Sequence, residues 1–141
     1  MDLSALYQEL ILKHYRHSAH KGALEAPDAE IQMNNPTCGD VIVLQLKAEG
    51  ERIAAVRFGG QGCAISQAAA SMMAHQVEGK TFAEAEALAE RFKQLLHGDA
   101  DAARDRALGD LRALAGVAKF PQRVRCAMLA WNALDEAKKR L

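Results

Sequence analysis

The chain has 141 residues and carries 18 Lys and Arg against 18 Asp and Glu, so its formal net charge at pH 7 is zero. This length suits a single domain, residues 1–141, that buries a hydrophobic core without disulfide support, and the charge balance argues against nucleic-acid and membrane-surface partners. Asp2 and Glu9 interrupt the apolar N-terminus, which argues against a secretory signal. No later run of apolar residues is long enough to span a bilayer, so we expect a cytoplasmic protein.

The first predicted element is an amphipathic helix over residues 2–17. Its apolar residues recur at helical spacing, and Asp2 is a suitable N-cap. The segment 18–28 then loses this period and contains Gly22 and Pro27, which predicts a connector. The helical spacing is set by Leu3, Leu6, Tyr7, Leu10 and Ile11.

Three short segments predict a small antiparallel sheet. Residues 41–47 (VIVLQLK) and 52–58 (RIAAVRF) are rich in β-branched and apolar residues, and the sequence Glu49-Gly50-Glu51 between them suits a hairpin turn. A further strand is expected at 30–34. Cys38 then lies in the loop between the first two strands.

The second half of the chain predicts helices. The glycines of GGQG let the backbone turn sharply before Cys63, which opens a segment of helical spacing. Thr81 to Glu84 has the form of a capping box for a helix that Gly98 ends, a short helix is expected within 99–116, and Pro121 suits the first turn of the last helix. Strands followed by helices, without strict alternation, predict an α+β domain with helices on one face of an antiparallel sheet.

The three cysteines are Cys38, Cys63 and Cys126. An odd number at wide spacing argues against a disulfide framework and leaves metal binding, reactivity or simple burial. Cys38 lies in a turn, Cys63 at a helix start and Cys126 in the first turns of the last helix. All three thiols could therefore face one point.

A carboxylate completes a possible metal site. Asp40 follows Cys38 by two residues, so in an extended segment both side chains project to the same side. With Cys63 and Cys126 the number of ligands reaches four, which is what tetrahedral zinc takes in a closed site.

Charged and histidine side chains leave alternatives open. Arg123 and Arg125 lie next to the last cysteine and could offset the negative charge of such a site, although a solvated helix face explains them equally well. His14, His17 and His20 are spaced like a helical metal face, but nothing else in that helix supplies ligands, which makes this the weaker hypothesis.

Three motifs in order carry a resemblance to a known family. These are NPTCGD around Cys38, GQGCAISQAAASMM around Cys63 and RVRCAMLAWNAL around Cys126. Together they resemble the U-type iron–sulfur cluster assembly proteins (IscU and NifU N-terminal-like), and within them the SufU branch. Arg125 stands where IscU scaffolds have a histidine, and the interval between the last two cysteines is longer; both features match SufU.

The resemblance implies a SufE/NifU-like α+β fold and a zinc site formed by Cys38, Asp40, Cys63 and Cys126. It further implies a SufS-type cysteine desulfurase as partner, with downstream iron–sulfur assembly proteins receiving the sulfur. We therefore expect a zinc-dependent sulfurtransferase in which Cys38 accepts persulfide sulfur, because its glycine-flanked loop can move. The alternatives are a scaffold that assembles a transient [2Fe-2S] cluster on the same residues and an adaptor with purely structural zinc.

Overall fold

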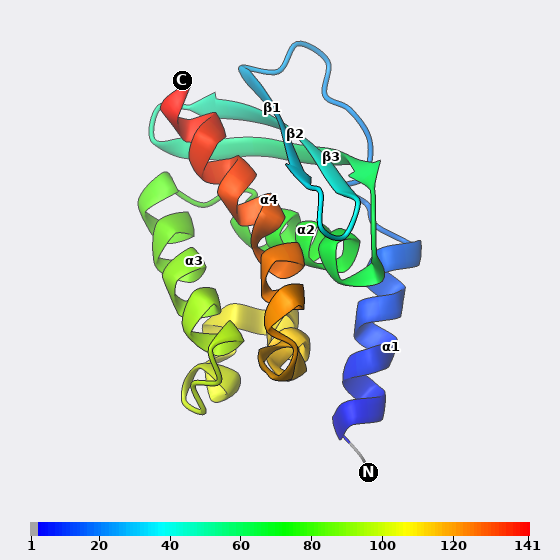
Figure 1. Cartoon of the computed structure of the whole chain (residues 1–141). Helices are drawn as coiled ribbons and strands as arrows, with labels where there is room; N and C mark the ends of the chain where they lie inside the picture. Colours follow the sequence, from blue (N-terminus) through cyan, green and yellow to red (C-terminus); the bar gives the residue numbers. More distant parts are fainter. Residues whose placement is uncertain (1–2) are drawn as a thin grey trace.

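The computed structural model describes residues 3–141, with side chains from residue 7 onward, and its elements surround one hydrophobic core (Figure 1). The predicted Asp2 cap lies outside the described residues. In chain order the elements are α1 (Leu3–Arg16), β1 (Ala29–Asn35), β2 (Asp40–Glu49), β3 (Arg52–Gln61), α2 (Ala64–Val77), α3 (Phe82–Leu96), the 3₁₀ segments η1 (Ala102–Arg104) and η2 (Arg106–Lys119), and α4 (Pro121–Lys139).

The sheet has the order β1-β2-β3 and is antiparallel throughout, as predicted. Side chains alternate across β2, so that Ile42, Leu44 and Leu46 are fully buried while their neighbours are less so. A two-residue turn joins β2 to β3, with Gly50 at a φ of 59°. The predicted α+β fold is confirmed.

Helices pack against one face of this sheet (Figure 1). Helix α4 contacts β1 and β2, helix α2 contacts β3, and both also contact each other. Cys126 and three alanines share the buried face of α4, where small side chains let the helix approach its neighbours closely. These alanines are Ala130, Ala133 and Ala137. Between residues 3 and 141, no helix combines the length and the apolar character needed to cross a membrane.

The last strand extends further than the sequence predicts. β3 continues through the glycines to Gln61, because Gly60 adopts a φ of 114° and lies against the backbone of β2. A Cβ at this position would lie 2.0 Å from the carbonyl oxygen of Val41. The glycines therefore allow the strand to continue, and Gly62 and Cys63 connect it to α2.

The predicted short helix near 99–116 is a 3₁₀ segment. In η2, Leu108, Leu111 and Leu114 are fully buried at a spacing of three residues, which is the repeat of a 3₁₀-helix. Gly109 interrupts it with a φ of 53° and a ψ of −131°.

The connector before β1 is fixed to the edge of β3. The amide of Phe58 donates to the carbonyl of His20 at 3.0 Å, and the amide of Gly22 donates to the carbonyl of Phe58 at 2.9 Å. These bonds belong to a short parallel bridge beside β3. The connector thus satisfies backbone groups that an edge strand would otherwise expose.

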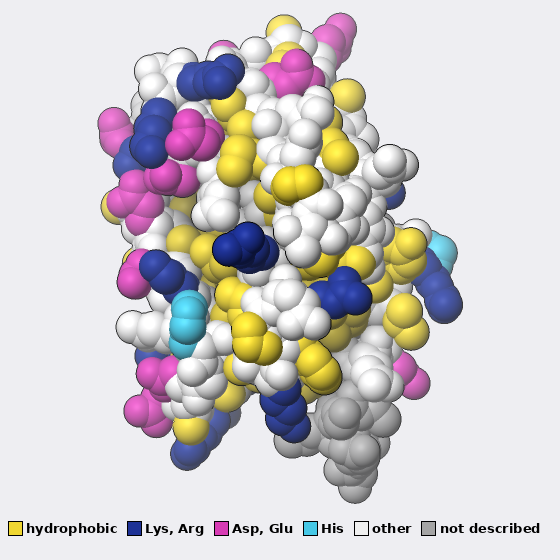
Figure 2. All heavy atoms as spheres, in the orientation of Figure 1, with side chains coloured by type: hydrophobic (Ala, Val, Ile, Leu, Met, Phe, Trp, Pro, Cys, Tyr) yellow, Lys and Arg dark blue, Asp and Glu magenta, His cyan; other side chains and the backbone are white. Residues whose placement is uncertain are grey.

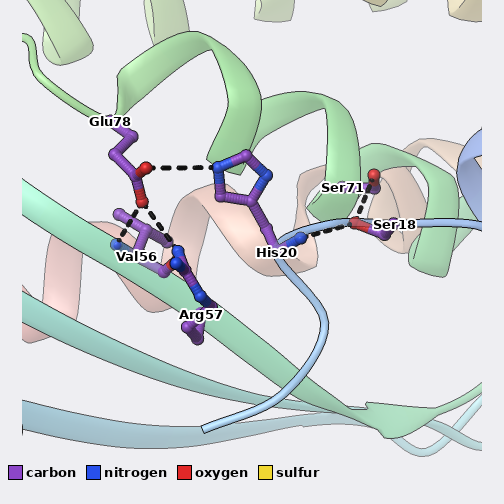
Figure 3. A network of polar contacts seen from close by, with 6 residues as sticks. All are labelled: Ser18, His20, Val56, Arg57, Ser71 and Glu78. Atoms are coloured by element: carbon purple, nitrogen blue, oxygen red, sulfur yellow. Dashed lines mark hydrogen bonds and ion pairs between the residues drawn. The ribbon is translucent and has the colours of Figure 1, made fainter. Parts of the chain in front are cut away.

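Glu78, which follows α2, reinforces this attachment (Figure 3). Its carboxylate accepts bonds of 2.9 Å from the amide of Val56 and from Arg57, and lies 3.5 Å from His20 Nε2. Burial raises the pKa of Glu78, but these donors outweigh it and hold the pKa below its ordinary value. One carboxylate therefore ties the connector, β3 and the end of α2 together.

Candidate metal centre

The β1–β2 hairpin presents Cys38 at its tip. Asn35 and Asp40 face each other as the last pair of the ladder, and residues 36–39 form the loop between them. The Cys38 amide donates to the Asn35 carbonyl at 3.3 Å, and Gly39 takes a φ of 71°, which favours glycine. The Cys38 side chain is half-buried in this loop.

Three of the predicted ligands lie together. Cys38, Asp40 and Cys126 each offer a donor atom, and these atoms all lie within 4.8 Å of one another. Asp40 and Cys126 are buried, with exposed fractions of 1% and 0%. Within residues 7–141 this is the one group of three or more such donors close enough to hold a metal ion.

Cys63, the fourth predicted ligand, stands beside this group and is not part of it. It is the N-cap of α2, and its sulfur accepts the Ser66 amide at 3.5 Å. Its own amide donates to Asp40 Oδ1 at 2.8 Å. Cys63 is thus connected to the group through Asp40, and its role as a ligand stays a prediction.

Gly62 allows this close approach between Asp40 and the start of α2. A Cβ at Gly62 would lie 2.3 Å from Asp40 Oδ1 and 2.7 Å from Ser66 Oγ. The hydroxyl of Ser66 donates to Asp40 Oδ1 at 3.1 Å. Only glycine leaves room for the carboxylate to reach the N-terminus of the helix.

Burial and hydrogen bonds act in opposite directions on Asp40. Desolvation raises its pKa, but hydrogen bonds from the Cys126 thiol, the Cys63 amide and the Ser66 hydroxyl outweigh it, so the pKa lies below its ordinary value. Asp40 is therefore ionised at neutral pH.

Cys126 shows the opposite shift. Burial, followed by the nearby Asp40 and Cys38, raises the pKa of its thiol far above the ordinary value, so the thiol is neutral without a cation. Arg123 supplies positive charge beside these residues: the proximity of Cys63, then of Cys126 and Cys38, raises the pKa of its guanidinium.

The donor set fits a thiophilic divalent cation. Two sulfurs and one carboxylate oxygen converge, and a third sulfur caps the adjacent helix. Several anionic donors in a buried place repel one another unless a cation joins them, and zinc takes Cys and Asp ligands in tetrahedral geometry. The three converging donors are therefore suited to zinc, and the four-residue ligand set stays a prediction.

The two arginines in the first turns of α4 have different surroundings. Arg123 faces the cysteines, whereas Arg125 lines a groove of about 370 Å³ between the end of β1 and α4. Hydrophobic side chains are exposed among basic ones over this side of the molecule (Figure 2). The apolar part of the groove is formed by Met33, Pro36, Val124, Met128 and Leu129.

The histidines do not form a metal face. His14 contacts Ser71 Oγ at 2.8 Å and Asp110 Oδ2 at 2.9 Å, and His20 faces Glu78, so these two side chains serve different polar contacts. The α1 helix ends at Arg16, before His17.

Sequence reasoning missed the polar residues that surround the donors. Asn35 contacts both Asp40 and Cys126, and Ser66 accepts a bond of 3.4 Å from Gln67. All three are buried. The signal available in the sequence was the hairpin itself, because a four-residue loop places Asn35 opposite Asp40.

Comparisons with known proteins place the whole chain in a family. The family model of the NifU-like N-terminal domain matches residues 6–127. The iron–sulfur cluster assembly scaffold protein IscU of Streptococcus pyogenes is 47% identical over 98% of this chain and 86% of that protein. The zinc-dependent sulfurtransferase SufU of Bacillus subtilis is 41% identical over 96% of this chain and 90% of that protein. A crystal structure of a hypothetical protein, 46% identical, covers 96% of this chain and 98% of that chain with a TM-score of 0.89.

Proposed function

The chain belongs to the family of NifU-like N-terminal domains, and from this premise we propose that it is an iron–sulfur cluster assembly protein that works as a zinc-dependent sulfurtransferase. Its substrate is persulfide sulfur from a SufS-type cysteine desulfurase, and its product passes to downstream iron–sulfur assembly proteins. One observation carries the proposal: the Cys38 thiol lies on a hairpin loop and adjoins a buried carboxylate and a buried thiol.

Cys38, Asp40, Cys63 and Cys126 would hold the zinc ion. When bound, zinc would keep its cysteine ligands deprotonated at neutral pH. Cys126 and Asp40 are buried and fixed on α4 and β2, so they are suited to remain as anchors.

Cys38 is the residue suited to accept sulfur. Its thiolate attacks the terminal sulfur of the desulfurase persulfide, a new sulfur–sulfur bond forms at Cys38 Sγ, and the bond within the donor persulfide breaks. The desulfurase cysteine leaves as a thiolate, so the exchange needs no oxidant. The positive charge of Arg123 faces the three cysteines and offsets the negative charge that the transferred sulfur brings.

The test is a desulfurase assay without iron. The zinc-loaded protein is mixed with its own organism's cysteine desulfurase, cysteine and reductant, and alanine and sulfide are measured. We expect strong stimulation by the native protein and none by Cys38→Ala, while Thr37→Ala, one residue away in the same loop, behaves as the native protein. Full stimulation by Cys38→Ala would refute the role of Cys38.

A second function has one specific observation in its favour. The relative that is 47% identical is named a scaffold protein, and the same donors could hold a transient [2Fe-2S] cluster. Anaerobic incubation with iron and sulfide distinguishes the two functions. A scaffold gains visible absorption and transfers its cluster to an acceptor, whereas a zinc sulfurtransferase stays colourless and loses activity with a chelator.

A further inference from the structure

Asn35 contacts all three members of the donor group. Its side-chain Nδ2 donates to Asp40 Oδ2 at 3.5 Å and to Cys126 Sγ at 3.5 Å. Its carbonyl accepts the Cys38 amide at 3.3 Å. Asn35 is 6% exposed, so these contacts lie out of bulk water.

The two oxygens of Asp40 have separate partners. Oδ1 accepts bonds from the Cys63 amide and the Ser66 hydroxyl at the start of α2. Oδ2 faces Asn35 Nδ2. Because both oxygens are held, the carboxylate is fixed in orientation, with Oδ2 toward the amide that also contacts Cys126.

An amide is well suited to this place. Asp40 and a Cys126 thiolate would repel each other across a buried gap, and an N–H group between them places partial positive charge toward both. A neutral amide adds no net charge to the group. Hydrogen bonds to metal ligands orient them, and removing such a partner lowers metal affinity about 10- to 100-fold.

The backbone fixes where this amide lies. Asn35 is the last residue of β1 and is paired directly with Asp40 across the ladder, so its position depends on the sheet and not on the loop of residues 36–39. Its neighbour Asn34 is exposed on the other face of the strand, where it accepts a bond from Gln32. The same residue type therefore occurs twice in succession, once beside the donors and once away from them.

We propose that Asn35 is a positioning residue of this centre, which holds Asp40 Oδ2 and Cys126 Sγ at the separation that a zinc ion requires. This inference rests on the proposed function, because it takes the donor group to be a metal site. It adds a residue outside the predicted ligand set, and it assigns that residue to affinity and geometry and not to sulfur acceptance.

The test compares Asn35→Ala and Asn35→Leu with Asn34→Ala as the matched control. Zinc affinity is measured by competition with a chromophoric chelator, and Co²⁺ is used as a second probe because its absorption bands report ligand geometry. Thermal unfolding of each metal-free variant is recorded alongside. Asn35→Leu preserves side-chain volume, so it separates lost hydrogen bonds from a new cavity.

We expect both Asn35 variants to bind zinc at least about tenfold more weakly than Asn34→Ala and to show shifted Co²⁺ bands. A smaller loss of affinity overturns the proposal. An unchanged Co²⁺ spectrum also overturns it, since Asn35 would then stabilise only the hairpin. Two further measurements separate a failure of this inference from a failure of the proposed function. If the native protein binds no zinc, or if Cys126→Ala binds zinc as tightly as the native protein, the proposed function itself fails.

Discussion

Replacement of Asp40 by alanine should destabilise the protein even without a metal ion. The change removes the acceptor of the amide of half-buried Cys63, and a donor left unsatisfied away from water costs about 1–3 kcal/mol. The Ser66 hydroxyl loses the same acceptor but keeps the Cys63 carbonyl at 3.1 Å, so its share is smaller. Loss of a negative charge at the N-terminus of α2 adds a few tenths of a kcal/mol.

The expected total is about 2–3 kcal/mol of unfolding free energy, or a fall in melting temperature of about 8 °C. No repulsion is relieved in return, because the buried Cys126 thiol is neutral without a cation. Asp40→Asn keeps an oxygen for the Cys63 amide, so we expect it to lose less than half as much. The experiment that checks these values is urea and thermal unfolding of the three proteins at pH 7 with a chelator present.

Two results would refute this reasoning. One is an Asp40→Ala protein that unfolds within about 0.5 kcal/mol of the native protein, below the cost of one unsatisfied buried donor. The other is an Asp40→Asn protein that is as unstable as Asp40→Ala, because then the carboxylate charge and not the cap would be responsible. The first result would leave Asp40 without a structural role in the metal-free protein, and the second would assign that role to its charge.

Three further changes test other parts of the fold. Gly60→Ala places a Cβ 2.0 Å from a β2 carbonyl at a φ of 114° and should cost at least about 2 kcal/mol, whereas Gly59→Ala, with open space around it, should cost less than half of that in the same urea titration. Thr81→Ala removes the N-cap of α3 and should cost about 1 kcal/mol, or about 3 °C in melting temperature; no change by calorimetry would contradict the cap. Glu78→Gln should be less stable than the native protein at pH 7, because the folded-state pKa of Glu78 is depressed below the ordinary value of 4.5. The stabilisation by ionised Glu78 is complete above a pH of 4.5 and is lost as the pH falls through the folded-state pKa, so the stabilities of the two proteins should converge in acid. A constant difference in stability from pH 7 to pH 3 would show that the charge of Glu78 is not responsible.

Much of the fold follows from local patterns. The β-branched and apolar residues of 41–47 and 52–58 predict strands, and the capping box at Thr81 predicts the start of α3 because its bonds are local. The end of β3 was harder to predict, since glycines usually end a strand. Here Gly60 lets β3 stay paired with β2, a tertiary reason that no local pattern contains.

The donor group was predictable to a similar extent. Residue types and turn positions selected Cys38, Asp40, Cys63 and Cys126. The structure brings Cys38, Asp40 and Cys126 together and places Cys63 beside them. The division of Asp40's oxygens between α2 and Asn35 was not predictable, because it depends on how the helix docks on the sheet. A buried amide and hydroxyl look like ordinary polar residues in sequence, and only their contacts reveal what they support.

The placement of Cys126 on the last helix has a consequence for the order of events during synthesis. Cys38 and Asp40 leave the ribosome with the first hairpin, while Cys126 follows only with α4. With the proposed ligand set, a metal ion that meets a growing chain finds an incomplete set of donors, and tight binding begins when α4 docks against the sheet. Metal occupancy and the docking of α4 are thereby thermodynamically linked, so that a bound ion favours chains whose folding is finished.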